Sequence, residues 1–219
     1  MNKILYKVID ISHWNGKIDF QKVIDSGVTG VIIKCGGSET KDGHTYQDKL
    51  FEDYYIQAKK VDLFVGAYYF GVGSDYLKGT EDALKCRELL KDKQFELPIY
   101  LDYECSSGTG RTNTKKNKKG NTEYCKGFCH TLENYNYFVG IYGSDNSTFK
   151  EMVNKTDLLD YTWWVARYSV AVPNYATENM KIWQFTSKGK VNGISGNTDI
   201  NYVYQDFPNI IRGIGKNGY

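Results

Sequence analysis

The chain contains the stretch Glu96-Leu97-Pro98-Ile99-Tyr100-Leu101-Asp102-Tyr103-Glu104, in which a short apolar run ends in two acids. If the run forms a strand, residues i and i+2 point to the same face. Asp102 and Glu104 are therefore expected to look into one cavity from the tip of a buried strand. Each carboxylate disfavours ionisation of the other, so one acid can keep its proton near neutral pH. A protonated acid beside an ionised one is the arrangement that cleavage of a glycosidic bond requires.

Size and composition are those of a globular domain. The 219 residues suffice for one barrel or one α/β domain with a full core. The net charge of +2 creates no global field, so we expect no nucleic-acid partner. Aromatic residues make up 15% of the chain. Most are expected to pack in the core, but the excess also suits a protein that binds carbohydrate.

The beginning of the sequence carries no visible targeting signal. Met1-Asn2-Lys3-Ile4-Leu5-Tyr6-Lys7 lacks a long apolar stretch and a small-residue cleavage site. No apolar run approaches the roughly 20 residues of a membrane span, so no membrane insertion is expected. The sequence therefore predicts a protein made in the cytoplasm, unless a leader precedes the residues given.

Strand-like and helix-like segments alternate along the chain. Runs rich in Val, Ile, Tyr, Trp and Phe favour strands, and segments with helical spacing of apolar residues fall between them. This alternation predicts an α/β fold, a single-domain irregular TIM-like β/α barrel with helices sparse in the last third. The expected strands span residues 7–11, 30–34, 64–70, 99–104, 138–142, 162–168, 181–186 and about 198–202, and the expected helices span 19–26, 46–60, 80–91 and 122–135.

Two polar segments interrupt this pattern. Residues 1–207 are predicted to form the barrel, and the Gly-rich residues 208–219 a polar tail or the start of a linker. Residues 106–121 are almost wholly polar and predict a solvated loop. Because they directly follow Asp102 and Glu104, a basic flap that meets an anionic polymer is the alternative.

Five cysteines leave at least one thiol unpaired. Cys125 and Cys129 have helical i, i+4 spacing beside His130, but a zinc site needs a fourth ligand that nothing nearby supplies. We therefore expect buried or partly buried thiols and no metal or cofactor. A bridge between Cys35 and Cys105, which each follow a predicted strand, remains an alternative.

Four acids fall where predicted strands begin or end: Asp10, Asp102, Glu104 and Asp199. In strand barrels, chemistry lies where strands end and loops begin. Taken singly, Asp10 could simply bond backbone amides or Ser12, and Asp199 could cap a turn. Four converging carboxylates could also hold a metal ion, although the histidines are scattered and the acids lack EF-hand spacing.

Several motifs together resemble the glycoside hydrolase family 25 lysozymes, from about Lys7 to Asn201. Val8-Ile9-Asp10-Ile11-Ser12-His13-Trp14-Asn15-Gly16 resembles the family's opening, Leu101-Asp102-Tyr103-Glu104 its catalytic Asp-x-Glu strand, and Asp199-Ile200-Asn201 its closing acid. Further segments follow in the family's order: Val31-Ile32-Ile33-Lys34, Val65-Gly66-Ala67-Tyr68-Tyr69-Phe70, Gly140-Ile141-Tyr142, Trp164-Val165-Ala166-Arg167-Tyr168 and Trp183-Gln184-Phe185-Thr186-Ser187.

The sequence also departs from the family pattern. Cys35-Gly36-Gly37-Ser38-Glu39 replaces a small residue followed by Thr-Glu-Gly, and Tyr69 replaces a common His. These changes concern the wall of the predicted cleft and leave the acids in place.

The resemblance implies a muramidase that hydrolyses the β-1,4 bond between N-acetylmuramic acid and N-acetylglucosamine in peptidoglycan. Glu104 would act as general acid, with the negative charge of Asp102, Asp10 and Asp199 keeping it protonated. Asp102 would stay ionised and stabilise positive charge on the sugar, or orient the substrate's 2-acetamido group as the internal nucleophile. We favour the second route, which predicts a retained anomeric configuration.

Aromatic and amide side chains at predicted strand ends are candidates for sugar binding, with plain barrel packing as the alternative for each. Trp164 and Tyr168 alternate onto one face, and Gln184 could bond an acetamido group. The predicted substrate-binding residues are Phe70, Tyr142, Trp164, Tyr168 and Gln184.

Two other functions stay open on the sequence alone. One is a non-catalytic barrel that binds cell-wall glycan, which would not need a protonated acid. The other is a chitinase-like enzyme, although its signature places more acids upstream, where this chain has Pro98 and Tyr100. In each case we expect a monomer. For the muramidase the partner is the peptidoglycan strand, reached as a holin-released endolysin or as a secreted autolysin.

Overall fold

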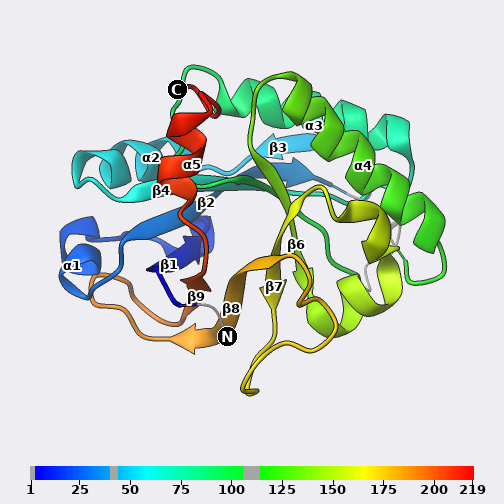
Figure 1. Ribbon diagram of the computed structural model, residues 1–219. Helices are drawn as coiled ribbons and strands as arrows, with labels where there is room; N and C mark the ends of the chain where they lie inside the picture. Colours follow the sequence, from blue (N-terminus) through cyan, green and yellow to red (C-terminus); the bar gives the residue numbers. More distant parts are fainter. Residues whose placement is uncertain (1–2, 40–43, 106–113) are drawn as a thin grey trace.

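The computed structural model describes residues 3–39, 44–105 and 114–219, and these residues form strands and helices in alternation (Figure 1). The strands are β1 (Tyr6–Ile11), β2 (Gly30–Ser38), β3 (Thr45–Gln47), β4 (Phe64–Phe70), β5 (Ile99–Asp102), β6 (Val139–Ser144), β7 (Thr162–Ala166), β8 (Met180–Gly189) and β9 (Thr198–Val203). The helices are α1 (Phe20–Asp25), α2 (Phe51–Lys60), α3 (Tyr76–Leu90), α4 (Lys118–Asn134) and α5 (Phe207–Gly213), with short helical turns η1 (His13–Asn15), η2 (Asp145–Met152) and η3 (Lys155–Leu158).

Eight of these strands close into a barrel. The order is β1-β9-β8-β7-β6-β5-β4-β2, and a pairing of β1 with β2 completes the ring, while β3 hangs on the edge of β2. Neighbours in the ring are parallel except at β9, which runs antiparallel to both β8 and β1. After α4, the described residues contain only η2, η3 and α5 as helical segments. The predicted irregular β/α barrel with few helices in its last third is therefore confirmed.

Period-two alternation divides the apolar residues into two cores. Those that point outward pack beneath the helices, and those that point inward fill the barrel. The inward cluster includes Val8, Ile32, Tyr100, Trp164, Ile182 and Val203, and α5 adds Phe207 and Ile211.

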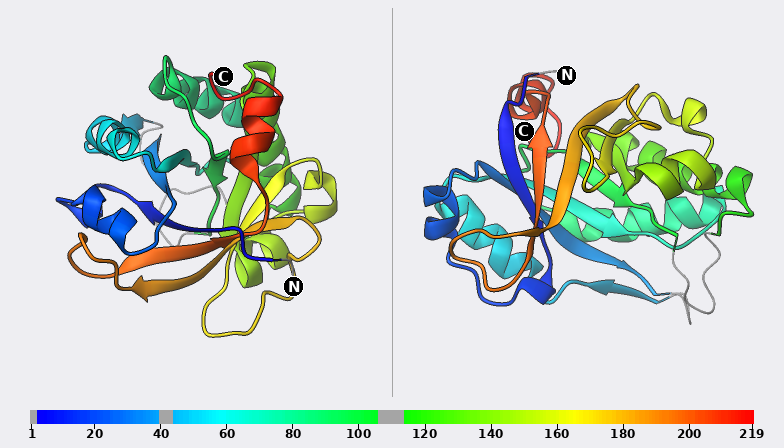
Figure 2. Two further views of the ribbon diagram at one scale, coloured as in Figure 1. Left: turned by 60° about the vertical axis from the view of Figure 1, so that its left-hand side comes forward. Right: turned by 90° about the horizontal axis from the view of Figure 1, so that it is seen from below.

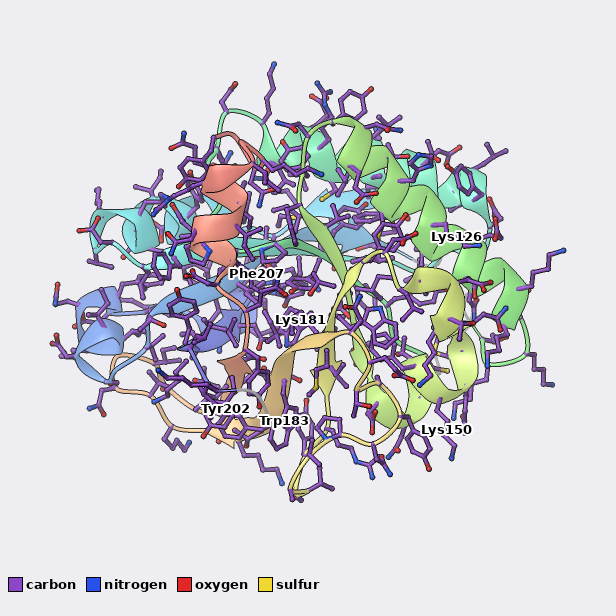
Figure 3. All side chains as sticks on the ribbon, viewed as in Figure 1. Lys126, Lys150, Lys181, Trp183, Tyr202 and Phe207 are labelled. Carbon is purple, nitrogen blue, oxygen red and sulfur yellow. The ribbon has the colours of Figure 1, made fainter. Side chains whose placement is uncertain are left out.

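Aromatic side chains, rather than a helix, lie on the outer face of β8 and β9. Figure 3 shows Trp183 and Tyr202 next to each other there, with ring centroids 6.3 Å apart. Phe185 stacks on Tyr202 at 4.2 Å. These rings shield the strands where the chain has no room for a crossover helix.

Among the described residues, no helix combines the length and the apolar character that crossing a bilayer demands.

Several predicted boundaries move for local reasons. Helix α2 begins at Phe51 rather than residue 46, because residues 45–47 pair with β2 as a short hairpin. Helix α3 begins earlier than predicted because Asp75 caps it, its Oδ1 accepting from the Lys78 amide at 2.9 Å. Helix α4 likewise begins at Lys118, so the polar loop predicted to reach residue 121 is shorter. Residues 106–113 of that loop lie outside the described residues.

The prediction that residues 208–219 form a tail or linker is wrong, because this segment packs against the barrel. Helix α5 lies next to the start of β1 (Figure 2, right), where the Tyr6 hydroxyl donates to Asp206 at 2.7 Å. Asn217 is fully buried, donates to the Leu97 carbonyl at 3.0 Å and accepts from the Phe138 amide at 2.7 Å. The polar composition of this segment suggested an exposed tail. Its polar groups instead form hydrogen bonds with backbone groups inside the fold.

Candidate active site

The four acids lie at one rim of the barrel, where β1 and β5 end and β9 begins. Asp102 is the last residue of β5, and Asp10 lies next to the end of β1. Because β9 runs antiparallel to β1, Asp199 near its start lies directly opposite Asp10. Strand β5 ends two residues before Glu104, but the Tyr103 amide still donates to the Tyr142 carbonyl at 3.0 Å. This hydrogen bond keeps the chain extended beyond the end of β5, toward Glu104.

These acids border one small cavity of about 160 Å³. Asp10 and Asp102 are buried, and Glu104 and Asp199 are partly exposed. We call this the inner cavity; its lining residues are Asp10, Tyr68, Asp102, Glu104, Tyr142, Trp164, Gln184 and Asp199. The expected meeting of the four acids at one end of the barrel is therefore observed.

Two side-chain amides hold Asp10 in position. Its Oδ2 accepts from Asn201 Nδ2 at 2.8 Å and from Gln184 Nε2 at 3.0 Å. The orientation of each amide is set by a second bond, because Gln184 Oε1 accepts from the Tyr142 hydroxyl at 2.9 Å and Asn201 Oδ1 accepts from Trp164 Nε1 at 2.7 Å. With both donors on Oδ2, the proton of a neutral Asp10 resides on Oδ1.

Burial and like charge make the inner cavity a place where acids keep protons. Burial raises the pKa of Asp10 to about 8, and repulsion from Asp199 and Glu104 adds to the effect, whereas the bonds from Asn201 and Gln184 oppose it. Burial also raises the pKa of Asp199. Burial and the surrounding acids raise the pKa of Tyr68 well above its ordinary value, so this hydroxyl stays neutral.

The raised pKa of Asp10 predicts a pH-dependent cost of folding. The folded chain keeps this proton up to about pH 8, whereas the unfolded chain releases it near pH 4. Unfolding therefore releases a proton between these values, and stability falls as pH rises through this window. We expect Asp10→Asn to match the wild type in urea denaturation at pH 4 and to be the more stable protein at pH 8. A difference in stability between the two proteins that is the same at both pH values would contradict a protonated Asp10 in the folded protein.

Some of the predicted substrate-binding residues line the inner cavity and others lie outside it. Tyr142, Trp164 and Gln184 line the inner cavity, although Trp164 is only 1% exposed and mainly packs. Phe70 lies beside Asp102 on the neighbouring strand, outside the set that lines the inner cavity. Tyr168 does not line it either, but its hydroxyl donates to Gln184 Oε1 at 2.5 Å.

Sequence analysis missed two residues of this site, Tyr68 and Asn201. Tyr68 lines the inner cavity, and Asn201 bonds both Asp10 and Trp164. Each lies two residues from a residue that had been identified, Phe70 and Asp199, so the same-face rule for strands could have found both.

A second, more open cavity of about 450 Å³ borders the first at Glu104, and we call it the outer cavity. It lies over the ends of β6 and β7 and the start of the β7–β8 loop. Besides Glu104, its lining residues are Ser144, Asn146, Ala166, Arg167, Tyr168 and Val170. Glu104 is thus the side chain that both cavities share.

The cysteines lie apart from the acids. Cys125 and Cys129 are buried on α4 as expected, while His130 is exposed and pairs with the Tyr76 hydroxyl at 2.9 Å, so these three do not converge. The Cys35 thiol faces Cys86 at 3.9 Å, whereas Cys105 is exposed, so the Cys35–Cys105 bridge does not form. Within the described ranges, no three His, Cys, Asp or Glu side chains are arranged to hold a metal ion.

Comparison with known proteins points to one family. The family model "Glycosyl hydrolases family 25" matches residues 9–194. The autolytic lysozyme of Clostridium acetobutylicum is 29% identical over 194 residues, which cover 89% of this chain and 54% of that protein. This chain therefore spans about half the length of that relative. Lysozyme M1 of Streptomyces globisporus is 25% identical over 204 residues, which cover 88% of this chain and 66% of that protein.

Solved structures agree with this. The CTP1L endolysin superposes with a TM-score of 0.78 at 27% identity, covering 95% of this chain and 70% of that one. The autolysin LytC from Streptococcus pneumoniae, solved in complex with a synthetic peptidoglycan ligand, gives a TM-score of 0.78 at 25% identity, covering 91% and 46%.

Proposed function

Because the chain belongs to glycosyl hydrolases family 25, we propose that it is a muramidase that cleaves the β-1,4 bond between N-acetylmuramic acid and N-acetylglucosamine in peptidoglycan. The observation that carries this proposal is the meeting of four acids in one cavity. The family resemblance of the sequence implies the same four residues. The names of its relatives, an autolytic lysozyme and an endolysin, support the same substrate.

Glu104 is the proposed general acid. It stands where the inner and outer cavities meet, so it can reach an oxygen that joins a sugar in one to a sugar in the other. Protonating that oxygen lets the leaving sugar depart as a neutral alcohol. Afterwards the same carboxylate takes a proton from the water that attacks the sugar left behind.

Asp102 is proposed to act on the sugar that stays in the inner cavity. As a carboxylate it would orient the 2-acetamido group, whose oxygen attacks the anomeric carbon, and stabilise the positive charge that develops there. Asp10 and Asp199 would shape the electrostatics of the same cavity. Asp10 in its neutral form adds no further negative charge beside Asp102 and could donate a hydrogen bond from Oδ1.

This route predicts retention, because two displacements at one carbon restore its configuration. We expect NMR spectra recorded during the first turnovers to show the β-anomer of the new reducing end, with no lasting covalent adduct on the protein. An initially formed α-anomer would rule the route out.

The broader proposal is tested by digestion of purified cell walls. We expect turbidity to fall and mass spectrometry of the soluble products to find N-acetylmuramic acid at the new reducing ends. Reducing-end N-acetylglucosamine, or activity on chitin but not on peptidoglycan, would replace this function with a chitinase-like one. Glycan binding without any cleavage would favour the binding barrel. The muramidase is proposed to act as a monomer on the cell wall, as an endolysin or an autolysin.

A further inference from the structure

The inner cavity is too small for both sugars of the bond that the proposed function cleaves. Its volume of about 160 Å³ is below the roughly 300 Å³ at which ligand pockets usually begin. A general acid must contact the oxygen between two sugars, so the second sugar has to lie on the other side of Glu104. The outer cavity, with about 450 Å³, is located there.

Among the described residues that line the outer cavity, Arg167 is the one with a cationic side chain. The backbone of Arg167 is held on both sides, because its amide donates to the Gln184 carbonyl at 3.1 Å and its carbonyl accepts from Trp183 Nε1 at 2.8 Å. The side chain is 22% exposed, so its charge is partly shielded from water. A partly desolvated guanidinium forms stronger charge-assisted bonds than one in bulk solvent.

The carboxylate that forms an ion pair with Arg167 already accepts other hydrogen bonds. Asp145 is fully buried and accepts backbone N–H bonds from Asn174, Tyr175 and Ala176 at 2.9–3.1 Å. Its Oδ2 lies 3.6 Å from Arg167 Nη1, which is beyond hydrogen-bond distance. Nη1 itself is buried, and within the described ranges it has no hydrogen-bond partner. Asp145 therefore supports the guanidinium electrostatically without a hydrogen bond to it, and Nε and Nη2, which are not among the buried unpaired atoms, are the donors that can meet another acceptor.

We propose that the outer cavity binds the leaving part of the glycan and that Arg167 binds a carboxylate carried by the substrate. This inference rests on the proposed function and adds a specificity-determining residue to it. The planar fork of a guanidinium matches a carboxylate in a bidentate bond. Peptidoglycan carries carboxylates on its stem peptides, and on its lactyl groups wherever a peptide has been removed. Chitin has neither, so Arg167 distinguishes the two polymers.

Three soluble ligands separate the sources of the carboxylate. The first is a glycan strand with stem peptides, the second the same strand after an amidase has removed the peptides, and the third an N-acetylglucosamine hexamer without any carboxylate. Their binding is measured by calorimetry on the inactive Glu104→Gln protein, alone and combined with Arg167→Gln. Arg87→Gln in the same background is the matched control, because Arg87 lies on α3, outside the residues that line either cavity, where it pairs with Glu88 and lies over the Tyr135 ring.

We expect Arg167→Gln to weaken binding of at least one carboxylate-bearing ligand about tenfold, the effect of a lost charge-assisted bond, and to leave the hexamer within about twofold. Loss confined to the first ligand identifies the peptide as the source, and loss confined to the second identifies the lactyl group. Equal loss for all three ligands, or for none, would overturn the inference. If the wild type cleaves no peptidoglycan while the selective loss persists, the proposed function fails and the carboxylate site stands.

Discussion

Glu104→Gln is expected to lower the rate of cell-wall lysis by a factor of about 10³, within the range that general acid catalysis contributes. Glutamine has almost the same size and shape as protonated glutamic acid but cannot transfer its proton to the leaving oxygen. The variant should therefore keep its fold and its glycan binding while losing turnover. Initial rates of turbidity loss on purified walls give the activity, and thermal unfolding gives the stability.

The matched control for this experiment is Glu81→Gln. Glu81 lies on α3 with a side chain that is 68% exposed. Its substitution therefore makes the same chemical change at a site away from the cavity. We expect wild-type lysis from this control. Lysis at the wild-type rate by Glu104→Gln would remove Glu104 from the role of general acid. A large fall in its unfolding temperature would instead mean that the carboxyl group is needed for the fold.

Asp145→Ala is expected to destabilise the protein by about 3 kcal/mol, since it leaves three backbone amides without their acceptor. For a chain of this size, that corresponds to a fall of about 6–12 °C in unfolding temperature. The three amides belong to the β7–β8 loop, which also carries Tyr168. The loosened loop should raise KM for the glycan more than it lowers kcat.

Two further variants make this result specific. Asp145→Asn keeps one acceptor oxygen for the Tyr175 and Ala176 amides, so we expect an intermediate loss of stability. Asp157 on η3 has a half-exposed carboxylate 3.9 Å from Lys126. Asp157→Ala should therefore lower the stability of the protein only slightly. If Asp145→Ala destabilised no more than Asp157→Ala, the three amides would have found water instead, and the carboxylate would not hold the loop.

Local patterns were sufficient for much of the fold. The apolar run that ends at Asp102 became β5, and the β–α alternation became a closed barrel. Both succeed because strand and helix periodicity are properties of neighbouring residues. The pattern failed for residues 45–47, whose pairing with β2 depends on a partner strand. It also failed for Asn217, whose bonding partners lie more than 70 residues away.

The site divides in the same way. Alternation along one strand was enough to pair Asp102 with Glu104, because the side-chain period of two is built into the backbone. Asp10 and Asp199 were selected as acids at predicted strand ends and by the family resemblance. Which atoms meet across the barrel was decided by strand order and register, as in the bonds from Asn201 and Gln184 to Asp10. Burial, and with it the raised pKa of Asp10, exists only once the barrel has closed. The contact of Arg167 with Asp145, which joins residues 22 positions apart on different elements, likewise depends on tertiary packing, since no local periodicity relates them.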